Sequence, residues 1–90
     1  MDSIHLQNQL EKLAQKLSVT LRYESIESEE VLFPGGLCRI KGEQVVIINS
    51  KAPSEEQLGA LGRALMQFDL TGVYLRPAVR DFLEQMQVSR

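Results

Sequence analysis

Cysteine and histidine are scarce in this chain of 90 residues, which contains one of each, Cys38 and His5. A protein zinc site uses three or four cysteine, histidine or carboxylate ligands, so the sequence predicts neither a metal site nor a cofactor. A catalytic thiol needs a lowered pKa and usually a neighbouring base, and nothing in the spacing brings His5 near Cys38. We therefore expect Cys38 to be a buried structural residue; the alternative is an enzyme that uses it as a nucleophile.

Long apolar runs and an excess of basic residues are also missing. The longest unbroken apolar run, residues 45–48, is too short to span a membrane, and the first residues lack the cationic stretch and apolar core of a signal peptide. Lysine and arginine number 10 against 12 acidic residues, whereas nucleic-acid-binding proteins usually carry a clear basic excess. Neither a membrane nor a nucleic acid is therefore expected as a partner. A lone cysteine forms no internal disulfide and needs no oxidising compartment, so a cytoplasmic location is expected.

The remaining pattern is that of one globular domain, residues 1–90. Hydrophobic residues make up 43% of the chain and charged residues 24%, which is ordinary for a globular protein. The apolar periodicity changes along the chain and gives the element order α-β-β-β-α-α. This order predicts an α+β fold in which helices pack on a three-stranded antiparallel sheet.

A helix and a strand are predicted in the first third of the chain. Apolar residues at spacings of four, three and four predict a helix over residues 3–17, with Asp2 or Ser3 as its N-cap. These residues are Leu6, Leu10, Leu13 and Leu17. Alternation over residues 19–26 predicts a half-buried strand. A polar loop at 27–30 and a turn at 34–36 follow.

Residues 37–40 and 43–49 are predicted to form a hairpin around Lys41 and Gly42. A two-residue loop with glycine in second place suits a type I′ turn. The resulting register places Cys38, Ile40, Val45 and Ile47 on one face and Leu37, Val46 and Ile48 on the other. Both faces are partly apolar, whereas a sheet with one face open to water should alternate more cleanly.

A second helix is predicted over residues 54–69, with Ser54 as N-cap and Gln57 closing a capping box. Its apolar arc covers roughly 220° of the helical wheel, well beyond an ordinary amphipathic stripe. Gly59 and Gly62 lie inside this helix, where each costs about 1 kcal/mol relative to alanine. Small residues at one-turn spacing allow close approach. They indicate either tight packing within the monomer, under the last helix, or a helix–helix contact between chains.

The last helix is predicted to begin at Pro77, after an extended segment at 73–75. Arg76 and Arg80 flank this proline. Two guanidinium groups beside the free N–H groups of a helix start are suited to bind an anion or a carboxylate. The alternative is a solvated face on which Arg80 pairs with Glu84.

Two resemblances involve these segments. Residues 35–49, the helix from Ser54 and residues 73–80 together resemble a group of small bacterial proteins of unassigned function. This likeness spans roughly residues 30–83 and implies a fold and a lineage, without an activity.

The hairpin that leads into the second helix also resembles the scaffold of the zinc metallopeptidases that cleave phage repressors. The helix of that family carries His-Glu-x-x-His. This chain has Leu61-Gly62-Arg63-Ala64-Leu65 at the comparable place. The resemblance therefore implies a scaffold without the metal, and no catalytic role is carried over.

The functional hypothesis that follows is a non-enzymatic protein that acts by association, most simply as a homodimer or through contact with another protein. The excess of apolar surface for so short a chain favours it. The expected contact residues are Gly59, Gly62 and Met66 of the second helix and Leu37, Val46 and Ile48 of the sheet. The alternative is a module that binds a small ligand or anion through Arg76 and Arg80.

Overall fold

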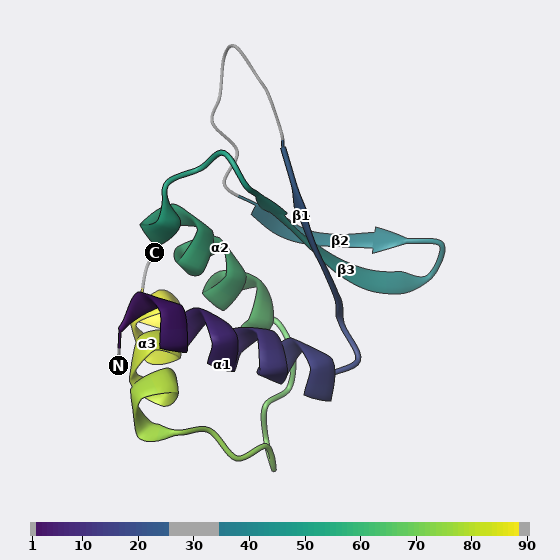
Figure 1. Cartoon of the computed structure of the whole chain (residues 1–90). Coiled ribbons are helices and arrows are strands. Elements are labelled where there is room, and N and C mark those ends of the chain that lie inside the picture. Colours follow the sequence, from purple (N-terminus) through teal and green to yellow (C-terminus); the bar gives the residue numbers. More distant parts are fainter. Residues whose placement is uncertain (1, 26–34, 89–90) are drawn as a thin grey trace.

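The computed structural model describes residues 2–25 and 35–88, and within them three helices lie on one side of a three-stranded sheet (Figure 1). The elements are α1 (Ser3–Lys16), β1 (Thr20–Glu24), β2 (Gly35–Ile40), β3 (Glu43–Asn49), α2 (Ser54–Leu65) and α3 (Pro77–Val88). The α+β class and the element order are as predicted. The predicted loop at 27–30 lies outside the described residues.

The N-cap of α1 is Asp2, one of the two residues expected there. Its carboxylate accepts a hydrogen bond from the backbone N–H of His5 at 2.9 Å, which satisfies one of the free donors of the first turn. The helix buries Leu10, Leu13 and Ala14 and exposes its opposite face. It therefore packs through one stripe only, as the leucine spacing predicts.

The sheet is mixed, so the prediction of a purely antiparallel sheet is wrong. The strand order is β1-β3-β2; β2 is antiparallel to β3, but β1 is parallel to it. β3 takes the centre because residues 45–48 are all apolar, which suits a strand with a neighbour on each side. The two outer strands then run in opposite directions without pairing with each other.

The hairpin between β2 and β3 has the predicted register, in which Leu37 pairs with Val46. Lys41 and Gly42 both have positive φ, 51° and 84°, as a type I′ turn requires. The turn expected at 34–36 is only partly described, because Pro34 lies outside the described residues. Gly35 and Gly36 are the first residues of β2, not turn residues.

The start and the end of α2 both differ from the prediction. Pro53 is the N-cap, no side chain caps the helix, and Ser54 is the first helical residue. The amide of Gln57 instead donates to the carbonyl oxygens of Ala52 at 2.8 Å and Ser50 at 3.3 Å, so it fixes the preceding loop. The helix ends at Leu65, four residues earlier than predicted.

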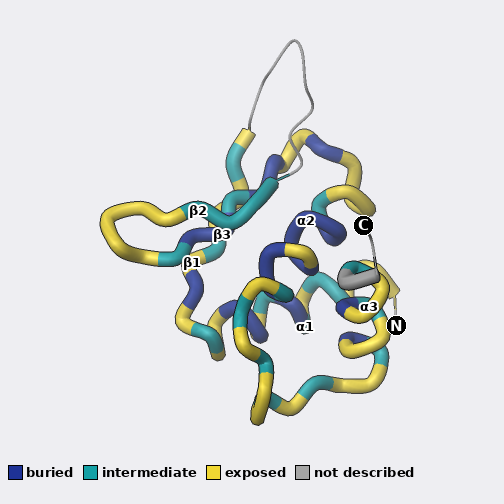
Figure 2. The backbone as a smooth tube through the Cα atoms, turned by 180° about the vertical axis from the view of Figure 1, so that it is seen from behind, coloured by how far each residue is buried: buried dark blue, intermediate teal, exposed yellow. Residues whose placement is uncertain are grey.

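The core is centred on α2, which contacts the sheet, α1 and α3 (Figure 2). Seven of its twelve residues are buried: Leu58, Gly59, Ala60, Leu61, Gly62, Ala64 and Leu65. α3 packs on α1 and α2 and, within the described residues, does not contact the sheet. The broad apolar arc of α2 is therefore covered by the sheet, α1 and α3 of the same chain.

Candidate functional site

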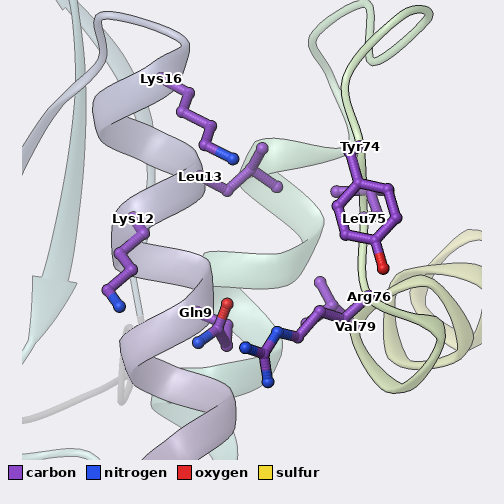
Figure 3. A pocket seen from close by; sticks show the side chains of 8 residues that line it. All are labelled: Gln9, Lys12, Leu13, Lys16, Tyr74, Leu75, Arg76 and Val79. Carbon is purple, nitrogen blue, oxygen red and sulfur yellow. The ribbon is translucent and has the colours of Figure 1, made fainter.

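A cavity of about 250 Å³ lies between α1 and the segment that leads into α3 (Figure 3). Its lining residues are Gln9, Lys12, Leu13, Lys16, Tyr74, Leu75, Arg76 and Val79. Two regions that are far apart in the sequence form its opposite walls. The site therefore exists only once α3 has packed against α1.

The first wall is one face of α1. Gln9, Lys12, Leu13 and Lys16 follow one another at helical spacing, so their side chains lie along a single stripe. Leu13 is buried in the core, which fixes the rotation of the helix about its axis. Lys12 and Lys16 are exposed at the edge of that buried face. The packing of Leu13 in the core thus places the two lysine residues along the cavity, and their long side chains stay free to move.

The second wall is the extended segment before α3. Exposure alternates along it: Leu75 is half-buried and packs on the core, whereas Tyr74 and Arg76 are exposed. Val79, in the first turn of α3, is buried and completes the apolar part of the lining. In Figure 3 the side chain of Arg76 extends from this wall towards Gln9 of α1.

The electrostatic character of the cavity is positive. Lys12, Lys16 and Arg76 line it, and no acidic side chain of the described residues does. Within residues 2–25 and 35–88, none of the three makes an ion pair with a carboxylate. The N-terminal end of α3, with its free N–H groups, adds partial positive charge at the same place. An anion entering the cavity would meet cations that no internal partner neutralises.

Only one of the two predicted ligand-binding residues lines this cavity. Arg76 does, whereas Arg80 is exposed one turn further along α3 and is not part of the lining. Lys12 and Lys16 were missed by the sequence reasoning. Their spacing of four, on either side of Leu13, was visible in the sequence. Tertiary packing, however, decides which side of α1 faces α3, and the local sequence pattern does not predict it.

The six predicted contact residues are largely enclosed within the chain. Val46 and Ile48 have no exposed surface, and Gly59 and Gly62 are also buried. The remaining two, Leu37 and Met66, are half-buried and pack on the core. The sheet face that was expected to meet a partner instead meets α2. The apolar excess that suggested an outside partner therefore serves the internal core.

The opposite face of the sheet carries Cys38, Ile40, Val45 and Ile47, the other set given by the hairpin register. Within the described part of the chain, no helix covers this face. Val45 is nevertheless buried, Cys38 and Ile47 are half-buried, and Ile40 is 39% exposed. Cys38 thus lies on the side of the sheet away from α1, the helix that contains His5.

A second cavity, of about 310 Å³, lies on the other flank of α1, against β1. At its edge the hydroxyl of Tyr23 donates to Oε2 of Glu11 at 2.6 Å and accepts from Nε2 of Gln7 at 2.9 Å. Burial, together with the hydrogen bond to Glu11, raises the pKa of the Tyr23 phenol to about 12. The carboxylate of this cavity is therefore engaged in joining α1 to β1.

Comparisons with known proteins add no assignment, because no protein-family model, curated protein or solved structure matches the chain. The two resemblances drawn from the sequence stay hypotheses. Among residues 2–25 and 35–88, no helix is both long and apolar enough to cross a membrane. The same residues contain no group of three potential metal-binding side chains.

Proposed function

We propose that this protein is a binding module for small anionic ligands and that the cavity between α1 and α3 is its binding site. The observation that carries the proposal is that Lys12, Lys16 and Arg76 all line one cavity, to which the described part of the chain contributes no acidic residue. These three cations form no ion pair among the described residues, and they give the cavity a positive charge in a chain whose net charge is −2. Carboxylates and phosphates are the ligands that suit them.

The lining groups have distinct roles in this proposal. The guanidinium of Arg76 offers a planar pair of N–H donors that matches two oxygens of a carboxylate or phosphate. The ammonium groups of Lys12 and Lys16 act as flexible point charges from the opposite wall. The buried side chains of Leu13 and Val79 form an apolar base, which strengthens electrostatic attraction by limiting the water around the ligand.

Binding is favoured over catalysis by the chemistry of the lining. The described lining residues include no carboxylate, histidine, serine or cysteine, so the site has neither a carboxylate base nor a serine or cysteine nucleophile paired with histidine. Charge and hydrogen-bond donors are the groups that remain. We therefore propose a non-enzymatic protein, in agreement with the expectation from the sequence.

Arg76→Gln and Arg80→Gln form a matched test of this proposal. Titration with inorganic phosphate, followed by backbone amide chemical shifts, is expected to move resonances of α1 and of residues 74–79 with saturation. Arg76→Gln should weaken binding about tenfold or more, because it removes a charge-assisted contact worth about 1.5–3 kcal/mol. Arg80→Gln should leave the dissociation constant within about twofold.

Two results would contradict the proposal. One is the absence of any saturable shift with phosphate or with acetate. The other is an equal loss of affinity in the two variants, which would show that general surface charge, rather than the cavity, attracts the anion.

Self-association is the second proposed function, now on a different surface. It is supported by the sheet face without a helix, on which Ile40 is 39% exposed and Cys38 and Ile47 are half-buried. A second copy laid on this face would remove that apolar surface from water. The support is weaker than for anion binding because Arg22 and Glu24 form an ion pair on the same face.

A further inference from the structure

Tyr74 is the one aromatic side chain among the described residues that line the cavity, and it is 74% exposed. Its neighbours Val73 and Leu75 are half-buried and pack on the core, so the backbone is held while the ring remains in solvent. Single exposed apolar residues are common on protein surfaces. This ring, however, lies at a cavity that is also lined by Lys12, Lys16 and Arg76, so a ligand held by these side chains could contact the ring as well.

The backbone around Tyr74 is constrained on both sides. The N–H of Val73 donates to the carbonyl oxygen of Leu70 at 3.1 Å, and Gly72 has a positive φ of 83° that sets the preceding turn. Pro77 restricts Arg76, the residue before it, to extended conformations. The segment therefore presents its side chains in a fixed alternation, and little ordering remains to be done when a ligand binds.

Tyr74 and Arg76 extend from the same side of this segment because residues two apart point the same way in an extended chain. Both line the cavity. Figure 3 shows Tyr74 across the cavity from α1, with the Arg76 side chain below it and reaching towards Gln9. One segment thus supplies an aromatic ring and a guanidinium to the cavity, and α1 supplies Lys12 and Lys16.

We infer that the ligand is an aromatic anion: a small ring that packs against Tyr74 and carries a phosphate or carboxylate held by Arg76, Lys12 and Lys16. The inference rests on the proposed anion-binding function and narrows it to a ligand class. A purely inorganic anion would make no use of the ring or of the apolar base formed by Leu13 and Val79. The volume of about 250 Å³ lies just below the usual range for binding pockets and limits the ligand to a small molecule.

The test compares ligands that differ only in the ring. Phenyl phosphate and methyl phosphate form one pair, and benzoate and acetate form the other, so the two pairs also distinguish a phosphate from a carboxylate. By calorimetry, the aromatic member of at least one pair is expected to bind the wild type about 3- to 10-fold more tightly, the gain typical of an aromatic pair. Tyr74→Leu should abolish this preference, and Tyr74→Phe should retain it.

A spectroscopic measurement on the wild type complements the variants. The chain contains no tryptophan and only two tyrosines, so Tyr23→Phe assigns the ring proton resonances of Tyr74. Phenyl phosphate or benzoate should shift these protons by ring-current effects. Methyl phosphate and acetate should shift them much less.

The results that would overturn the aromatic ligand differ from those that would overturn anion binding itself. Equal affinities within both ligand pairs, or an equal loss for both members of a pair in Tyr74→Leu, would overturn the aromatic assignment and leave anion binding in place. If neither pair binds with saturation and Arg76→Gln changes nothing, the proposed function itself is overturned, and the inference falls with it.

Discussion

At the scale of single residues, two glycines of α2 that look equivalent in the sequence occupy different environments. A Cβ on Gly62 would lie 2.7 Å from Cε2 of Phe82 and 3.1 Å from Cγ of Met86, both on α3. The three atoms nearest to a Cβ on Gly59 would all belong to the guanidinium of Arg63, the first at 3.2 Å. Gly62 is therefore required by the close approach of α3, whereas Gly59 faces an exposed, flexible side chain that can move aside.

Alanine substitutions at these two positions are expected to have opposite effects. Each gains about 1 kcal/mol of helix propensity, but Gly62→Ala also forces α3 outwards, at a cost of about 1–3 kcal/mol. Gly62→Ala should lower the free energy of unfolding by about 1 kcal/mol, and Gly59→Ala should raise it by up to about 1 kcal/mol. Urea denaturation measures both. Stabilisation by both substitutions would show that α3 packs less closely on Gly62 than the structure indicates.

At the scale of elements, the sequence predicts contacts between neighbouring segments, such as the β2–β3 hairpin, but not the pairing of segments that lie far apart in the chain. The register of the β2–β3 hairpin follows from the Lys41–Gly42 turn, because two residues set the geometry of both strands. The direction of β1 relative to β3 depends on a pairing between segments more than twenty residues apart, and no turn chemistry encodes it. The candidate site divides in the same way: Arg76 was predicted from its own segment, but Lys12 and Lys16 needed the packing of α1 against α3.

The attachment of α1 to β1 leads to a prediction about pH. Folding keeps the Tyr23 phenol protonated up to about pH 12, whereas the unfolded phenol ionises near its ordinary pKa of 10.0. Between these values the unfolded chain binds fewer protons than the folded one, so stability falls as pH rises. The contribution is complete below about pH 10 and is lost by about pH 12.

Tyr23→Phe removes this contribution and leaves the rest of the pH dependence in place. The difference in unfolding free energy between wild type and variant, measured by urea denaturation, should therefore shrink from about pH 9 to about pH 12. Phenolate absorbance of the folded wild type should show one tyrosine that titrates near pH 12, absent in the variant. A difference that stays constant over this range would contradict the hydrogen bond between the Tyr23 hydroxyl and Glu11.

At the scale of the whole molecule, the apolar residues of α2 that suggested an interface form the core of the chain instead. The arc of α2 was interpreted as too broad for a monomer, but this helix is covered on three sides by the sheet, α1 and α3. A sequence pattern shows how much of a helix is apolar. It does not show whether the covering surface belongs to the same chain or to another. Oligomeric state therefore has to be argued from the surface that remains exposed.

Ile40→Lys, with Ile4→Lys as its control, tests association through that surface. Ile40 lies on the sheet face without a helix, and Ile4, 72% exposed, lies at the start of α1 on the other side of the sheet. If the sheet face forms a dimer, sedimentation at micromolar concentration should give a dimer for the wild type and for Ile4→Lys, and a monomer for Ile40→Lys. A wild-type monomer would exclude the dimer under these conditions.

The parallel pairing of β1 with β3 also sets an order of assembly during synthesis. Residues 20–24 leave the ribosome well before residues 43–49, and the helices that cover α1 are made later still. Until then, the described contacts available to α1 and β1 are those with each other. Such non-local pairing slows folding. The first helix and strand therefore lack most of their packing partners until the second half of the chain is made. A truncation before α2 would leave α1 without the helices on which it packs, and a truncation before β3 would also leave β1 without its partner strand.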